Sequence, residues 1–109
     1  MTEQDNALML EFKQRLSQDT RRHLRKLIVF GSRATGQATE DSDLDVVALV
    51  DDRSPEIESQ LDETAYRVMW EHDFRPIISL KVFSEAQFNA ALNQGFSFYK
   101  HVAREGISV

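Results

Sequence analysis

Hydrophobic side chains recur along the chain in two spacings, one typical of helices and one typical of buried strands. In residues 5–18 the apolar side chains fall on one helical face, which predicts an amphipathic helix. They are Leu8, Met9, Phe12 and Leu16. Two short runs, residues 27–31 and 44–50, are almost wholly apolar, as expected of strands buried on both faces. A third strand is predicted over residues 77–83.

Capping residues mark where the later helices begin. Ser54 is a good N-cap and Pro55 suits the first helical position, so we expect a helix that runs to about residue 72. Its buried face is predicted to carry Ile57, Leu61, Ala65, Val68 and Met69. A capping box that starts at Ser84 predicts another helix, and a last one is expected over about 97–105.

The order of these elements, helix–strand–turn–strand–helix–strand–helix–helix, indicates the α/β (α+β) class. We expect a small mixed β-sheet with helices packed mainly on one face, in a single domain over residues 1–109. The strands at 27–31 and 43–50 should be neighbours. Hydrophobic residues make up 41% and charged residues 28%, an ordinary globular mixture.

Charge and cysteine content exclude several classes of function. With 13 Lys and Arg against 18 Asp and Glu, the formal charge is −5, which argues against a dedicated nucleic-acid binder. The absence of cysteine excludes disulfides and thiolate metal sites, and it fits a reducing, cytoplasmic location. The N-terminus is acidic and polar, unlike a signal peptide, and the apolar runs are too short to span a membrane.

Two carboxylates supply the first candidate chemistry. Asp43 and Asp45 stand two residues apart at the start of the second strand, so their side chains should face the same way. Like charges about 4 Å apart repel by roughly 4 kcal/mol at an effective dielectric of 20. A divalent cation removes this repulsion, and Mg²⁺ typically takes one or two carboxylates plus substrate phosphates. We therefore expect both aspartates to bind Mg²⁺.

Phosphate donors are predicted at the end of the preceding strand. Gly31 allows the backbone to approach a ligand, and the Ser32 hydroxyl and nearby amides can donate to phosphate oxygens. Arg33 could add a charge-assisted contact to the same phosphates. Metal ligands on one strand and phosphate donors on its neighbour predict a nucleoside triphosphate site.

The spacing of the two motifs is more specific than either alone, because ten residues separate Gly31-Ser32 from Asp43-x-Asp45. This spacing resembles the signature of the DNA polymerase beta-like nucleotidyltransferase superfamily. The strings VFGSRATG and DSDLDVV resemble in particular the minimal nucleotidyltransferases, antitoxins that are often paired with HEPN-domain toxins.

The resemblance covers essentially the whole chain and carries definite implications. It implies a nucleotidyltransferase fold and a transfer of AMP from ATP, with Mg²⁺, to an acceptor hydroxyl, by family a tyrosine of a HEPN-type toxin. Gly31 and Ser32 would hold phosphates, and Asp43 and Asp45 would bind metal and serve catalysis.

One feature departs from the family pattern. Active members usually supply a third carboxylate from the next strand, whereas residues 77–83 contain no Asp or Glu. Ser79 and Lys81 should share one face of that strand. Glu71 and Asp73 could substitute only if the strand starts earlier. The missing third carboxylate affects the expectation of catalysis, and it does not affect the expectation of metal and nucleotide binding.

Three functions therefore stay open: an enzyme that adenylylates a protein partner, a small-molecule nucleotidyltransferase, and an antitoxin that acts by binding alone. The second is disfavoured because such enzymes usually carry an extra substrate domain. A P-loop is excluded because Gln37 and Ala38 stand where that motif requires Lys and Ser or Thr.

Two further groups of residues are assigned to structure. The basic run over residues 21–26 is interpreted as a solvated helix end. Four aromatic residues are expected in the core because of their periodicity. They are Trp70, Phe74, Phe83 and Phe88.

Overall fold

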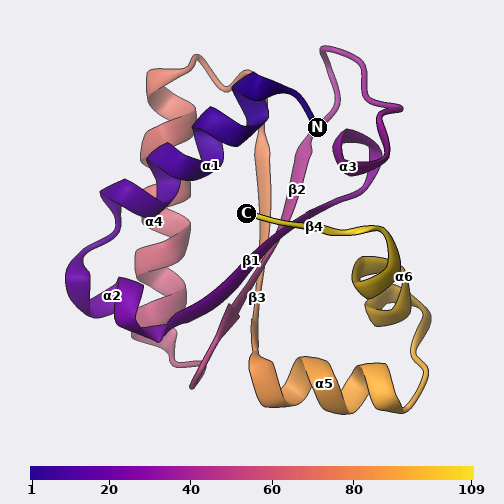
Figure 1. Cartoon of the computed structure of the whole chain (residues 1–109). Coiled ribbons are helices and arrows are strands. Elements are labelled where there is room, and N and C mark those ends of the chain that lie inside the picture. The colour runs from indigo at the N-terminus through magenta and orange to yellow at the C-terminus, as the bar shows by residue number, and fades with distance from the viewer.

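A four-stranded mixed sheet forms the centre of the molecule, in a computed structural model that describes residues 1–109 (Figure 1). The strand order is β3-β2-β1-β4. Strands β1 (Leu24–Phe30) and β2 (Leu44–Val50) pair antiparallel, and β3 (Ile78–Ser84) pairs parallel to β2. The two-residue strand β4 (Ile107–Ser108) pairs antiparallel to β1. The α/β class and the pairing of the two predicted neighbour strands are confirmed.

Six helices accompany the sheet, and most begin at residues with a capping side chain. Thr2, Ser17, Ser54 and Ser84 each accept a hydrogen bond from a backbone amide three residues ahead, which satisfies a free donor of the first turn. The helices are α1 (Glu3–Arg15), α2 (Gln18–His23), α3 (Ser32–Thr35), α4 (Pro55–Glu71), α5 (Glu85–Asn93) and α6 (Ser97–Glu105). No helix is long and apolar enough to cross a membrane.

One face of the sheet is fully covered by α1 and α4 (Figure 1). Even-numbered residues of β2 point to this face, where they pack with the buried sides of both helices. The helical residues are those predicted for the core, Leu8, Met9, Phe12 and Leu16 on α1 and Leu61, Ala65 and Val68 on α4. Alternation along β2 therefore sends its odd-numbered residues, including Asp45, to the opposite face.

That opposite face is covered only in part, which corrects the expectation that the helices lie mainly on one face. A second cluster joins Val47 and Leu49 of β2 to Phe88 of α5 and Val102 of α6. In Figure 1, α5 lies at the end of the molecule where β3 finishes, far from the starts of β2 and β3. The half of this face that carries Asp45 is the end that α5 leaves free, although Phe98 of α6 packs against Phe30, which lies opposite Asp45.

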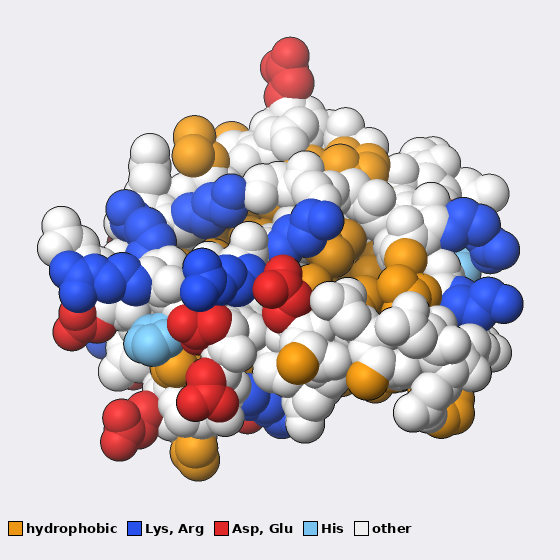
Figure 2. Space-filling model, turned by 60° about the horizontal axis from the view of Figure 1, so that its bottom comes forward, with side chains coloured by type: hydrophobic (Ala, Val, Ile, Leu, Met, Phe, Trp, Pro, Cys, Tyr) orange, Lys and Arg blue, Asp and Glu red, His pale blue; other side chains and the backbone are white.

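Several local features differ from the expectation. Strand β1 begins at Leu24, three residues early, and α2 precedes it where only a solvated helix end was expected. Two of the arginines of this region pair with carboxylates, Arg22 with Asp19 and Arg25 with Asp51, and Arg21 donates to backbone carbonyls at the end of α1. Figure 2 shows a similar mixture on the face that it presents, where Asp and Glu side chains lie beside several Lys and Arg side chains.

The largest error concerns Trp70, which was expected in the core. Its exposed fraction is 65%, and Tyr66, one turn earlier on α4, is 53% exposed. Both lie on the face of α4 opposite to Leu61, Ala65 and Val68, so helical geometry directs them away from the sheet. Phe88 is buried as predicted, and Phe74 and Phe83 are partly buried.

Candidate nucleotide and metal site

The pairing of β1 with β2 brings the two sequence motifs together. Phe30, the last residue of β1, lies opposite Asp45. Gly31 follows directly and starts the turn into α3, while Asp43 comes just before β2 begins. The motifs that are ten residues apart in the sequence thus meet at one end of the β1–β2 pair.

Gly31 shows how close this approach is. A Cβ atom built on Gly31 would lie 2.5 Å from Oδ2 of Asp45, so the contact leaves no room for any side chain. The backbone of Gly31 also has φ 74° and ψ −157°, a region that is essentially restricted to glycine. Two independent constraints, one steric and one conformational, therefore require glycine beside the Asp45 carboxylate.

The environment of the Asp45 carboxylate favours the binding of a cation. Burial, and secondly the negative charge of Asp43, raise the pKa of the Asp45 carboxyl above its ordinary value, while the charge of Lys81 lowers it in part. An effect of the Asp43 charge on Asp45 requires the two carboxylates to lie within reach of each other, in line with the i, i+2 spacing. A divalent cation bound by both carboxylates would offset the burial of the Asp45 charge and its repulsion by Asp43.

Strand β3 places Ser79 and Lys81 on the same face as the carboxylates. Ser79 lies beside Asp45 in the parallel register, and Lys81 lies beside Val47. Neither is a carboxylate, and no group of three His, Cys, Asp or Glu residues could hold a metal ion. The alternatives for the third carboxylate lie elsewhere, since Glu71 ends α4 and pairs with Arg15, and Asp73 precedes β3 by five residues.

The residues present therefore suit one Mg²⁺ rather than a fully acidic two-metal site. Asp43 and Asp45 would supply two oxygen ligands, and Mg²⁺ commonly completes its shell with water and substrate phosphates. Ser32 begins α3 close to them, and its hydroxyl takes no part in the hydrogen bonds of the turn, which use the carbonyls of Gly31 and Ser32. A phosphate between Ser32 and the metal would match this arrangement.

Arg33 has different contacts from those expected of a phosphate ligand. Its Nε and Nη2 atoms donate to the carbonyl of Ser42 at 3.0 and 2.7 Å, and Nη1 donates to Asp5 at 3.0 Å. Both side chains of the Arg33–Asp5 ion pair are nearly buried, with exposed fractions of 10% and 2%. Because Ser42 directly precedes Asp43, the guanidinium fixes the backbone that carries a predicted metal ligand. Contact between Arg33 and phosphate stays a prediction.

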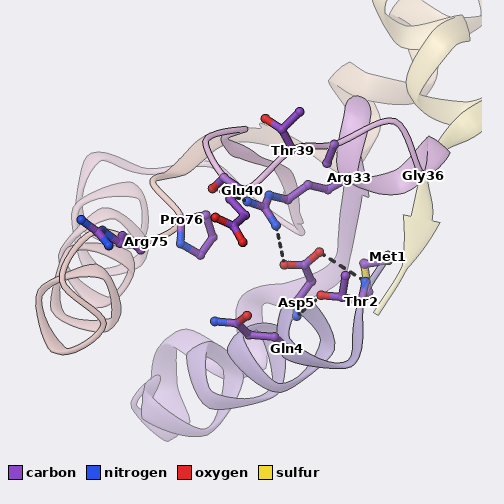
Figure 3. A pocket seen from close by; sticks show the side chains of 11 residues that line it. Met1, Thr2, Gln4, Asp5, Arg33, Gly36, Thr39, Glu40, Arg75 and Pro76 are labelled. Carbon is purple, nitrogen blue, oxygen red and sulfur yellow. Dashed lines mark hydrogen bonds and ion pairs between the residues drawn. The ribbon is translucent and has the colours of Figure 1, made fainter.

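We call the contacts of Arg33 with Asp5 and with the Ser42 carbonyl the clamp. Figure 3 shows the clamp inside a pocket of about 420 Å³. The Arg33 side chain reaches from α3 toward Asp5, which also accepts a bond from the Thr2 amide at the start of α1. The lining does not include Asp43 or Asp45. No local pattern indicates this contact, because Asp5 and Arg33 are 28 residues apart and neither belongs to an apolar pattern.

Comparison with known proteins supports the geometry. A family model described as a nucleotidyltransferase domain matches residues 9–97, which include both motifs. The chain belongs to the nucleotidyltransferase domain family. A relative from Methanocaldococcus jannaschii named "putative protein adenylyltransferase" is 31% identical over 96 residues, which cover 88% of each chain.

The fold of this nucleotidyltransferase also occurs among solved structures. A chain from the crystal structure of a toxin–antitoxin with AMP-PNP superposes with a TM-score of 0.57 at 17% identity. The match covers 95% of this chain and 70% of the other. At that level of identity the similarity establishes the shared fold alone.

Proposed function

We propose that this nucleotidyltransferase transfers AMP from ATP, with Mg²⁺, to a hydroxyl of a partner protein, and that it acts as the antitoxin of a toxin–antitoxin pair. The acceptor would be a tyrosine of a HEPN-type toxin, as the family resemblance implies. The observation that carries the proposal is the meeting of Gly31 with the Asp45 carboxylate beside Asp43. The name of the archaeal relative and the assembly of the structural neighbour point in the same direction.

The proposed reaction is a displacement at the α-phosphorus of ATP. The acceptor oxygen forms a bond to that phosphorus, the bond to the β-phosphate oxygen breaks, and pyrophosphate leaves. The hydroxyl proton passes to a base or to water. Bound Mg²⁺ would supply charge neutralisation on the phosphate oxygens.

The residues of the chain divide this work between them. Asp43 and Asp45 would hold the metal. Gly31 leaves room for the Asp45 carboxylate, and the Ser32 hydroxyl would donate to a phosphate oxygen. Arg33 holds the Ser42 carbonyl and so keeps Asp43 in place.

Position 79 on β3 is where the site lacks a base. Ser79 is the residue paired with Asp45, and the nearby Lys81 brings a positive charge to the same face. General-base catalysis typically contributes about 10²–10⁴-fold, so transfer should be slow by roughly that factor. A slow rate still suffices for an antitoxin that modifies each toxin molecule once.

Two other functions compete with this proposal. The presence of Ser79 where a carboxylate base is expected favours an antitoxin that binds nucleotide and toxin without transfer. A small-molecule nucleotidyltransferase is disfavoured, because such enzymes usually carry an extra substrate-binding domain.

Transfer and binding can be separated in one set of measurements. Calorimetry with Mg²⁺ and AMP-PNP should show binding by the wild type and none by Asp43→Asn or Asp45→Asn. Labelled ATP and the copurified partner should then give one AMP per partner chain. Binding without transfer would establish the non-enzymatic antitoxin, and unchanged nucleotide affinity in both variants would refute the site.

A further inference from the structure

A cluster of three aromatic side chains lies on the surface beside the proposed site. Tyr66 and Trp70 stack on the outer face of α4 with ring centroids 6.5 Å apart. Phe74, just after the helix, contacts both rings edge-on at 5.6 and 6.1 Å. We call these three residues the aromatic patch. Tyr66 and Trp70 remain more than half exposed, so the rings pack on one another rather than in the core.

The backbone is strained where it turns Phe74 onto the patch. Asp73 and Phe74 have φ values of 56° and 55°, in the left-handed region that residues other than glycine seldom adopt. Hydrogen bonds from the Phe74 amide to Met69 and from the Arg75 amide to His72 hold this turn. Strain of this kind persists where the surrounding structure enforces it, and it is concentrated at functional surfaces.

The patch adjoins the site through a shared pocket of about 350 Å³. Phe74 and Ile77 line it, and Ile77 is itself 51% exposed. Asp43, the proposed metal ligand, also lines it. A group that reaches Asp43 through this pocket therefore passes directly beside the aromatic patch.

The charges of the pocket select the kind of molecule that fits. Three carboxylates, those of Glu40, Asp41 and Asp43, face one cation, Arg75. Even with Asp43 neutralised by metal, Glu40 and Asp41 outnumber the one cation, so the wall repels the phosphates of RNA. A second copy of this chain is also disfavoured, because each copy carries a formal charge of −5.

We propose that the aromatic patch is the docking surface for the polypeptide segment that presents the acceptor hydroxyl. The segment would place an apolar side chain against Trp70 and Phe74 and a Lys or Arg near Glu40 and Asp41. Exposed Trp and Tyr are the residue types that most often dominate protein–protein binding energy. The inference rests on the proposed function and names the feature that recognises its protein substrate.

The single tryptophan of the chain makes docking directly observable. Two synthetic peptides would each carry one tyrosine and one leucine, flanked either by lysines or by glutamates. With Mg²⁺ and AMP-PNP present, the lysine peptide should shift the emission of Trp70 to shorter wavelength, and the glutamate peptide should not. No shift with the lysine peptide up to millimolar concentration would overturn the proposal. So would an equal shift with single-stranded RNA, or a concentration-dependent shift of the protein alone.

Variants then test which residues are responsible, with a fluorescein-labelled lysine peptide read by anisotropy. Trp70→Ala should weaken peptide binding about tenfold or more and leave the Kd for Mg²⁺ and AMP-PNP unchanged. Phe96→Ala is the matched control, because Phe96 is 54% exposed on a different part of the chain. Equal peptide affinity in Trp70→Ala and the wild type would overturn the docking surface.

AMP transfer to the same peptides is measured separately by mass spectrometry. Docking at the patch without transfer would refute the proposed activity and leave the docking surface standing. Transfer that is equally fast in Trp70→Ala would support the activity and refute the docking surface.

Discussion

Replacement of Gly31 by alanine tests the site at its narrowest point. The new Cβ would lie 2.5 Å from Oδ2 of Asp45, well inside van der Waals contact. That oxygen is the end of a side chain that can rotate away, so the overlap should displace the carboxylate rather than unfold the protein. The substitution should lower stability chiefly through backbone strain, because alanine at φ 74° and ψ −157° costs about 1–3 kcal/mol.

Two other glycines provide matched controls for this strain. Gly36 and Gly95 have φ values of 80° and 81°, and a Cβ on either would meet no atom within 4 Å. Alanine there should cost about 1–2 kcal/mol from backbone strain alone. All three variants should therefore show modest losses in urea denaturation.

The variants should differ in nucleotide binding. In calorimetry with Mg²⁺ and AMP-PNP, Gly31→Ala should lose at least tenfold in affinity because the Asp45 ligand is displaced. Gly95→Ala should bind like the wild type. If Gly31→Ala keeps wild-type affinity, then the contact with Asp45 does not organise the metal site and the reasoning is wrong.

Three further perturbations address the neighbouring residues. Asp45→Asn should stabilise the metal-free protein at pH 7: burial and the neighbouring carboxylate raise the pKa of Asp45 in the fold, so ionisation opposes folding. In thermal melts its advantage over the wild type should grow as pH rises from the ordinary aspartate pKa of about 3.9 through the raised value; a constant difference would contradict this. Arg33→Met should cost about 3–5 kcal/mol in urea denaturation, since it strands the buried Asp5 carboxylate. Arg67→Met, from an exposed pair, should cost under about 1 kcal/mol, and equal losses would argue against the clamp. Ser79→Asp should raise single-turnover AMP transfer by up to about 10²-fold; a slower rate would mean that another group already acts as the base.

Local signals were sufficient to predict most elements of this fold. The Ser54–Pro55 start of α4 and the apolar run of β2 depend on capping and burial that neighbouring residues determine. The 97–105 helix was predicted with the bounds that the structure has. The meeting of Gly31 with Asp45 followed from the spacing of the motifs and the pairing of adjacent strands.

What could not be predicted depends on contacts between distant segments. The two residues of β4 are a strand only because β1 offers an open edge at Ile28 and Val29. The six-residue helix α2 has no apolar face of its own. Trp70 is apolar, but its position on α4 rather than its hydrophobicity decides that it faces solvent. The Arg33–Asp5 pair joins two polar residues whose proximity only the folded chain creates.

The span from Gly31 to Asp45 has a consequence for how the protein acquires its activity. All the proposed phosphate and metal ligands lie within fifteen consecutive residues, closed by the antiparallel pairing of β1 with β2. Short loops close quickly and at low entropic cost, so these groups should converge as soon as that pair of strands forms. Nascent chains would then acquire affinity for Mg²⁺ and ATP at the same step, and saturating nucleotide should slow unfolding of the strand pair more than fraying of α6.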